Sequence, residues 1–121
     1  MATLKRAMLR HEATLILPKG VTEWQAPDGD TRILLKRVCV QRVSGLNVNS
    51  LNQEVQTQAT LWFDAKLSLP LGCNLLKYKE EAEAVGGRLG ILYDGHEYSV
   101  SRVLERLDGF GRLHHYEVEL V

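Results

Sequence analysis

The chain has 121 residues, 45% of them hydrophobic and 25% charged, a composition typical of a folded soluble domain that argues against overall disorder. This length predicts one domain over residues 1–121, with residues 1–6 as a mobile arm. Fifteen basic and fifteen acidic side chains cancel. The balance argues against a dedicated nucleic-acid binder, because such proteins usually carry a basic excess.

The two cysteines indicate a reducing compartment. Cys39 and Cys73 are too few for a disulfide framework, and Cys39 lies in an apolar run where a buried free thiol is the ordinary interpretation. This favours a cytoplasmic site of synthesis. No stretch has the length of a signal core or a membrane span, so we expect no membrane partner.

The first half of the chain contains two strand-like segments. The segment from Ala7 to Leu17 is apolar and β-rich and is ended by Pro18. Residues 31–43 carry alternating apolar side chains whose phase shifts between Leu35 and Val38. The shift predicts either a bulge or a strand that is buried on both faces at its middle. A helix fits the length, but the β-branched content favours a strand.

A polar connection and another strand follow. Residues 44–52 are rich in Asn and Ser, which favour turns, and they predict a long loop. Residues 54–65 then show the clearest alternation in the chain, which predicts a strand with Leu61 and Phe63 on its apolar face.

Residues 73–84 differ in kind, because they contain strong helix formers. Asn74 is suited to cap the start, and Gly86-Gly87 is suited to follow the end, so we expect one short helix near 74–84.

The last third predicts a three-stranded meander. Residues 89–93 and 98–104 flank Asp94-Gly95, the pair that a type I′ hairpin turn requires, and a phase change at Val103 and Leu104 suggests a bulge or a bend. A second turn at residues 108–111 precedes a final strand ending at the C-terminus, with Glu117 and Glu119 facing away from its apolar side. Short strands without βαβ alternation predict a mainly β fold: a small antiparallel barrel, or a sandwich, of six or so strands.

No catalytic constellation is visible, so we expect neither enzyme activity nor a cofactor. Neighbouring His114 and His115 would point to opposite faces of a strand, and His96 lacks the spacing of a metal site. The glycine-rich stretch 86–90 lacks the Lys-Ser/Thr pair of a phosphate loop.

Four basic residues in the second predicted strand are candidates for contacts with phosphates. The alternative is a solvated strand face whose charge is balanced by neighbouring glutamates, and the zero net charge favours it. The four residues are Arg32, Lys36, Arg37 and Arg42.

Three segments resemble the minor capsid proteins of tailed bacteriophages and prophages. They are residues 60–65 (TLWFDA), 93–100 (YDGHEYSV) and 113–121 (LHHYEVELV), and the resemblance extends from about residue 7 to the C-terminus. It transfers no catalytic residue. The matching residues are interpreted as determinants of the fold: Phe63, Tyr93, Gly95, Tyr98 and Tyr116.

The resemblance implies a virion protein of the head–tail junction, of the stopper or head-completion type. Such a protein would form a homo-oligomeric ring below the portal or adaptor, close the DNA channel and dock the tail. The implied partners are other copies of itself, portal and adaptor proteins, a tail terminator or tail tube protein, and packaged DNA bound without sequence preference. The implied location is the virion, and the bacterial cytoplasm during assembly.

We expect edge strands and the long loop to supply the subunit contacts of such a ring. The candidate channel or ring-contact loop comprises Ser44, Gly45, Leu46, Asn47, Val48, Asn49, Ser50, Leu51 and Asn52. Two other classes remain open. One is a small barrel that binds single-stranded nucleic acid, and the other is an enzyme of a phage lysis cassette, which would need a catalytic dyad or a metal.

Overall fold

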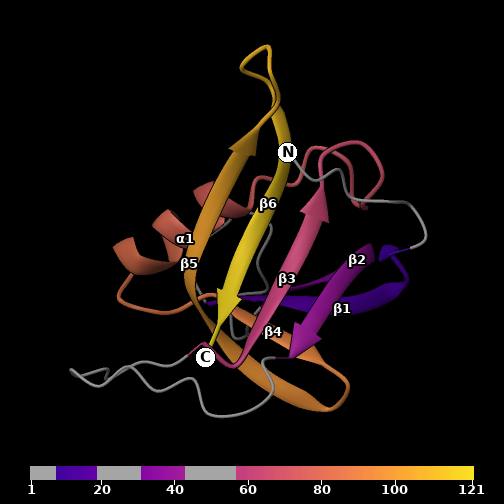
Figure 1. The fold of residues 1–121 in the computed structure, drawn as a ribbon. Helices are drawn as coiled ribbons and strands as arrows, with labels where there is room; N and C mark the ends of the chain where they lie inside the picture. The colour runs from indigo at the N-terminus through magenta and orange to yellow at the C-terminus, as the bar shows by residue number, and fades with distance from the viewer. Residues whose placement is uncertain (1–7, 19–30, 43–56) are drawn as a thin grey trace, which may run out of the picture.

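The computed structural model describes residues 8–18, 31–42 and 57–121, which form a closed antiparallel β-barrel with one short helix (Figure 1). The expected barrel is therefore confirmed, and its strands number six. In chain order the elements are β1 (His11–Leu17), β2 (Thr31–Arg42), β3 (Ala59–Asp64), α1 (Leu75–Ala84), β4 (Gly90–Tyr93), β5 (His96–Leu107) and β6 (Leu113–Leu120).

The barrel consists of two three-stranded meanders joined along both sides. Its strand order is β1-β2-β3-β6-β5-β4, and β1 pairs with β4 to close it. The connection from β3 to β4 carries α1, which packs beside β5 (Figure 1). Because every strand has two neighbours, the barrel leaves no whole edge strand free for pairing. Our expectation that edge strands supply subunit contacts is wrong for this part of the chain.

Alternate side chains of the strands fill the interior of the barrel. Leu61 and Phe63 of β3 face Val118 and Tyr116 of β6, and all four are buried. This confirms the alternation seen in the sequence on that strand. Other side chains of the core come from every strand and from the helix: Ala13, Leu15, Leu17, Leu35, Val38, Val40, Leu75, Ala82, Ile91, Tyr98, Val100, Val103 and Leu120.

A bulge lies where the sequence changes phase in β2. His11 pairs with Val38 and Glu12 with Lys36, so Arg37 is an extra residue, and its φ is +58°. Beyond the bulge, Val38, Cys39 and Val40 are all buried. Both interpretations of the phase shift are therefore correct, because a bulge precedes a segment that is buried on both faces.

The prediction that Asn74 caps the start of α1 is confirmed. The Asn74 side chain accepts a hydrogen bond from the Lys77 amide at 3.0 Å. It also accepts one from the hydroxyl of Tyr116 at 3.2 Å, which ties the helix start to β6. The helix ends at Ala84, Val85 is its C-cap, and Gly86 follows with a φ of +77°.

The two hairpins of the second meander have the predicted turns. Asp94 and Gly95 have φ of +52° and +78°, which is the conformation of a type I′ turn. The register of β5 against β6 shifts between Val100 and Arg102, just before the predicted bulge. At the C-terminus, Val121 exchanges backbone hydrogen bonds with Ser99, so the chain end is tied to the sheet as expected.

Two predicted strands are shorter than the sequence suggested. The first begins at His11 rather than Ala7. The third begins at Ala59, and residues 54–56 of that prediction lie outside the described residues. The Gln58 amide still donates to Leu120 O at 2.7 Å, but β6 ends there, so among the described residues no partner strand continues beside residue 57. The alternation of side chains in one segment does not show where the neighbouring strand that pairs with it ends.

Candidate functional site

The four basic residues singled out in the sequence all lie exposed on β2. Arg32 and Lys36 share its outer face, about 13 Å apart by the rise of a strand, and Arg37 is the bulge residue. These three residues make no ion pair with any acidic side chain of the described ranges. The structure thus places along one half of β2 three cations that have no acidic partner in the part of the chain it describes.

Arg42 is separated from that group. Its Nη2 lies 3.1 Å from Asp94 Oδ2, and its guanidinium lies over the ring of Tyr93 at 5.8 Å from the ring centre. The ring of His11 contacts the same tyrosine edge-on, with centroids 5.4 Å apart. Arg42 therefore joins the end of β2 to the β4–β5 turn, and its charge is balanced. The proposed contact of Arg42 with phosphate stays a prediction.

A buried serine holds the bulge that exposes Arg37. The Ser68 hydroxyl donates to the carbonyl oxygen of Arg37 and accepts from the Asp64 amide at 2.8 Å. Lys36 and Leu69 exchange both backbone hydrogen bonds, at 2.9 and 3.0 Å. The segment after β3 is thus docked on β2, and the backbone beneath the cations has a defined conformation.

The candidate loop at residues 44–52 lies outside the described residues. Its assignment as a channel or ring-contact loop stays a prediction, as does the mobile arm at residues 1–6.

The two adjacent histidines of β6 do not diverge as predicted. Their Nδ1 atoms lie 2.7 Å apart, and their rings meet edge-on at 4.9 Å between centroids. The reason is a second bulge: Arg106 pairs with His115 and Leu107 with Leu113, so His114 is an extra residue. A bulge breaks the strict alternation of side chains, and the prediction from period 2 was therefore wrong here.

These histidines belong to a hydrogen-bonded chain on the outer face. His115 Nε2 donates to Glu117 Oε2 at 3.1 Å, and Arg106 Nε donates to the same oxygen at 2.9 Å. Burial tends to raise the pKa of Glu117, but the hydrogen bonds from His115 and Arg106 outweigh it and hold that pKa below its usual value. The Nδ1 atoms of His114 and His115 lie within hydrogen-bond distance of each other, which extends this set of contacts to His114. These four side chains are hydrogen-bonded to one another, so their polar groups are satisfied within the protein.

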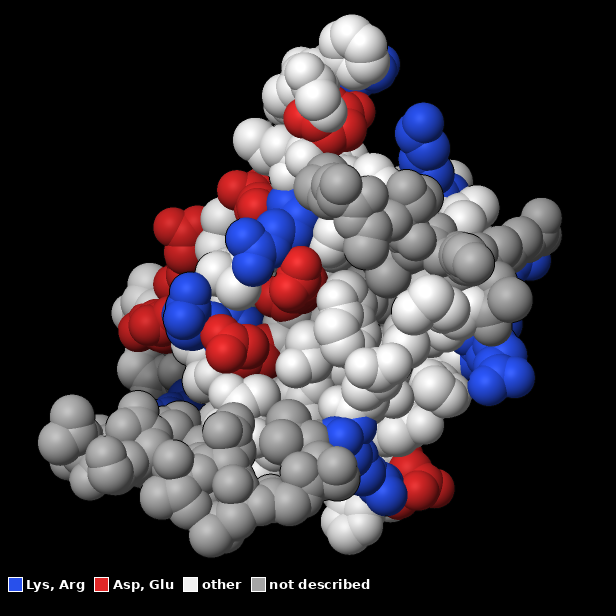
Figure 2. Space-filling model, viewed as in Figure 1, with Lys and Arg blue, Asp and Glu red and all other residues white. Residues whose placement is uncertain are grey.

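Charges of opposite sign continue along this face. Arg102 Nε lies 3.3 Å from Glu119 Oε2, one step along the sheet from the pair of Arg106 with Glu117. Figure 2 shows these charges interspersed over β5 and β6, with a largely uncharged area over β3 beside them. The outward position predicted for both glutamates is confirmed. A face of paired charges favours a solvated surface over a binding site for phosphate.

The β5–β6 hairpin extends beyond the barrel and ends in a tight turn (Figure 1). This turn carries an exposed aromatic residue. Phe110 is 84% exposed, and Leu107 beside it is 49% exposed. The Asp108 carboxylate accepts from the amides of Phe110 at 2.7 Å and Arg112 at 3.0 Å. These backbone hydrogen bonds lower the pKa of Asp108, although desolvation opposes them. The aromatic ring is therefore presented on an ordered turn.

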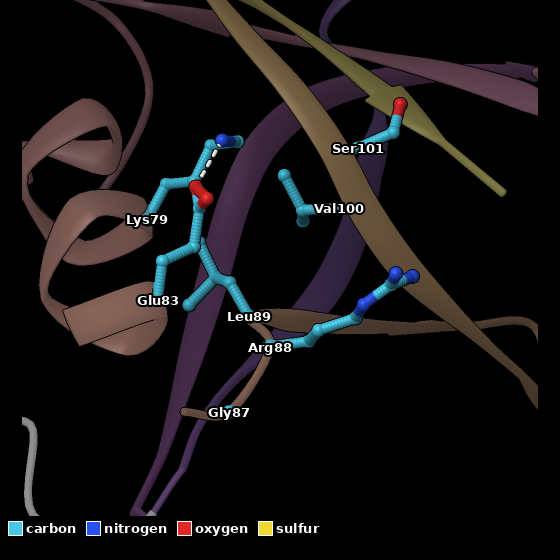
Figure 3. A pocket seen from close by; sticks show the side chains of 7 residues that line it. All are labelled: Lys79, Glu83, Gly87, Arg88, Leu89, Val100 and Ser101. Atoms are coloured by element: carbon cyan, nitrogen blue, oxygen red, sulfur yellow. Dashed lines mark hydrogen bonds and ion pairs between the residues drawn. The ribbon is translucent and has the colours of Figure 1, made fainter. Parts of the chain in front are cut away.

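A pocket of about 270 Å³ lies between α1 and β5 (Figure 3). Lys79 and Glu83 of the helix form one wall and pair with each other, while Arg88 lies below them on the segment that leads into β4. Leu89 and Val100 make its apolar floor. Ligand pockets usually measure about 300–1,000 Å³, so this one is suited to a single side chain rather than a cofactor.

The two thiols are buried and free. Burial raises the pKa of Cys73 to about 11 and also raises that of Cys39, against the opposing charge of Arg10. Both therefore stay protonated near neutral pH, and the thiol form is a poor nucleophile.

Within residues 8–18, 31–42 and 57–121, no three His, Cys, Asp or Glu side chains are grouped so that they could hold a metal ion. In the same ranges, no helix combines the length and the apolar character needed to cross a bilayer.

Comparison with known proteins gives no match. No family model, no curated protein and no solved structure matches this chain.

The exposed hairpin turn is the feature that sequence reasoning missed. Residues 108–111 were assigned to a turn, but Phe110 was not singled out. The available signal was its place between Gly109 and Gly111, because an aromatic residue within a glycine-rich tight turn has few neighbours to pack against.

Proposed function

We propose that this chain is a structural protein of a bacteriophage or prophage virion, a head–tail connector of the stopper or head-completion type. In this proposal it is a minor capsid protein that assembles as a ring below the portal or adaptor, closes the DNA channel and docks the tail. The observation that carries the proposal is the β5–β6 hairpin, which offers an ordered aromatic turn outside a closed barrel. The three sequence segments that resemble such proteins support it.

The chemistry of the described residues fits a role in assembly. Each described strand of the closed barrel has a hydrogen-bonded neighbour on both sides, and Arg102 and Arg106 on the β5–β6 face pair with Glu119 and Glu117. Among the described residues, the hairpin turn, the pocket beside α1 and the cations of β2 are candidate surfaces for partners. The proposal assigns no catalytic step and no cofactor to the chain.

Each of these surfaces has a proposed partner in the virion. The hairpin turn contacts sister copies or the adjoining portal, adaptor, tail terminator or tail tube proteins. Arg32, Lys36 and Arg37 face the phosphates of packaged DNA without reading its sequence. The protein is made in the host cytoplasm and ends in the virion.

Deleting the gene from its native genome and inducing particle production tests the proposal. We expect filled heads that lack tails or lose their DNA, together with free tails, in electron micrographs. Supplying the gene in trans should restore joined particles. Normal tailed virions in the deletion strain, or the absence of particles from the undeleted strain, would contradict the proposal.

A second candidate is a small barrel that binds single-stranded nucleic acid. One observation favours it: Arg32, Lys36 and Arg37 are exposed and have no acidic partner among the described residues. A gel shift with a labelled oligonucleotide at rising salt concentration tests it. Under this alternative the triple variant R32S/K36S/R37S loses binding, whereas K77S, on the exposed face of α1, retains it. Micromolar binding with a steep salt dependence would favour this class.

A further inference from the structure

The two adjacent histidines of β6 direct a ring nitrogen each to the same point. We propose that His114 and His115 form a binding site for a divalent transition-metal ion that accepts imidazole ligands at right angles, Ni²⁺ or Cu²⁺, and that both residues bind it through Nδ1. The chain supplies two ligands, and water molecules fill the other positions. The site does not depend on the proposed ring.

The spacing of the two nitrogens fits neighbouring ligands of one metal ion. Bonds from a metal to imidazole are about 2.0–2.1 Å long, so two nitrogens at 90° are about 2.9 Å apart, and two at a tetrahedral angle are about 3.3 Å apart. The Nδ1 atoms of His114 and His115 lie 2.7 Å apart, with 79° between the ring planes. The right-angled arrangement needs the smaller displacement, and it is typical of Ni²⁺ and Cu²⁺, whereas Zn²⁺ prefers tetrahedral sites.

The ring of His115 is held as a metal ligand usually is. Its Nε2 lies 3.1 Å from Glu117 Oε2, and Arg106 Nε donates to the same oxygen at 2.9 Å. An ionised carboxylate only accepts hydrogen bonds, so this contact requires a proton at Nε2 and leaves a neutral His115 with a lone pair at Nδ1. A histidine that binds a metal typically donates its other ring N–H to a carboxylate in this way, which fixes its orientation and raises its basicity.

The backbone of the β6 bulge places the second ligand. His114 is the extra residue of the bulge, and its carbonyl oxygen accepts from the Ala65 amide at 3.0 Å, so the ring lies beside His115 in a fixed position. When the two Nδ1 atoms are hydrogen-bonded and both rings are neutral, His114 carries the proton between them. Metal binding removes that proton from Nδ1, and solvent returns one to Nε2 of the same ring. Both imidazoles then stay neutral, and no net proton is released.

The charges beside the pair favour a cation. Arg106 balances Glu117, and Asp64 lies opposite His115 where β3 pairs with β6, so its side chain is on the same face. The Asp64 carboxylate accepts from two backbone amides of the following turn, which makes it a source of negative charge rather than a ligand. His114 is only partly buried, so an ion reaches the pair from its side.

The other two histidines of the chain lack this arrangement. The Nδ1 of His11 accepts the Val40 amide at 3.0 Å, so that nitrogen is already occupied. His96 is exposed at the start of β5, and its ring contacts Tyr98. Among the described residues, neither of these rings contacts another imidazole. His96 therefore offers a matched control.

Titration of the full chain, without an affinity tag, with NiCl₂ near neutral pH tests the site. Isothermal titration calorimetry should show one saturable site in the unmodified chain. H114A should abolish it, because one of the two ligands is lost. E117Q keeps both ligands but loses the orienting carboxylate, so it should weaken binding about tenfold. H96A should bind Ni²⁺ as the unmodified chain does, and circular dichroism shows whether each variant keeps the β-fold.

A second measurement on the unmodified chain needs no variant. Six-coordinate Ni²⁺ is paramagnetic, so the amide signals of residues 113–116 should broaden first as the ion is added. The absence of saturable binding, an unchanged affinity in folded H114A, or broadening centred on His96 or His11 overturns the inference. None of these outcomes affects the proposed function, which the gene deletion tests separately.

Discussion

Two aromatic residues near opposite ends of β5 have opposite fates. Tyr98, just after the β4–β5 turn, is 8% exposed and belongs to the core, whereas Phe110, just after β5, is 84% exposed. Tyr98 follows the tight turn at Asp94-Gly95, and Phe110 lies within the tight turn at residues 108–111, which also contains Asp and Gly. The difference lies in what each turn adjoins, because the first is joined to β2 through Arg42 and the second extends past the end of the barrel. Local turn chemistry therefore makes a hairpin, and only the surrounding strands determine whether its aromatic side chain is buried.

The largest expected effect separates these two aromatic residues. Y98A should lower the free energy of unfolding by about 3 kcal/mol, as truncation of a buried aromatic side chain does. F110A should change it by less than about 0.5 kcal/mol, as for an exposed site. Urea unfolding followed by circular dichroism measures both. Equal losses of unfolding free energy in Y98A and F110A would show that Phe110 packs against the barrel, contrary to the structure.

The next effect concerns the backbone and should be alike in the two turns. Gly95 and Gly111 both have φ of +78°, and a Cβ at either would meet open space. G95A and G111A should each lose about 1–2 kcal/mol from the left-handed conformation alone. Gly109, which also has open space but no positive φ, is the matched control, and G109A should be near neutral. Thermal melts of the three variants give the comparison.

A smaller effect should distinguish the acidic residues of the two turns. D108A removes the acceptor of the Phe110 and Arg112 amides, whereas D94A removes an exposed pair with Arg42. We expect faster hydrogen exchange at residues 110 and 112 in D108A and no such change in D94A. The pKa of Asp108 is lowered, so this protection should be present above the pKa of a free Asp and fade as pH falls through the lower folded value. Unchanged exchange in D108A would mean that the turn is ordered by other contacts.

The smallest effect is a dependence of stability on acid pH at the foot of the projecting hairpin. The pKa of Glu117 is lowered, so the unfolded state binds its proton more readily than the folded state. Its contribution, under about 1 kcal/mol for such a pair, is complete above the unfolded pKa and is lost as pH falls through the folded one. E117Q should flatten that part of the stability profile. E97Q, at an exposed site on the first hairpin, is the control and should leave the profile unchanged.

Much of the fold was accessible from local patterns. The Asp94-Gly95 pair, the Asn74 cap and the alternation at Leu61 and Phe63 each act over a few residues, and the structure has all three. The phase shift near Arg37 also predicted a bulge correctly. The rings of His114 and His115 were misplaced, because their bulge depends on the register of β5 against β6, which no local pattern shows.

The candidate surfaces divide in the same way. Exposure of Arg32 and Lys36 follows from alternation, but the pairing of Arg42 with Asp94 joins residues that are 52 positions apart. The pocket beside α1 likewise needs a helix, a loop and β5 in one place. Such sites depend on contacts between residues that are far apart in the sequence, and local sequence patterns do not predict those contacts.

By itself, the sequence determined the strand-forming segments, the helix and its cap, and both tight turns, because these depend on the φ preferences and side-chain spacing of neighbouring residues. Only the tertiary structure decided that six strands close into a barrel, that Ser68 holds the β2 bulge, and that Phe110 stands outside the core. The physical reason is that closure, register and burial depend on which distant strands become neighbours, and those contacts are formed by the whole chain at once.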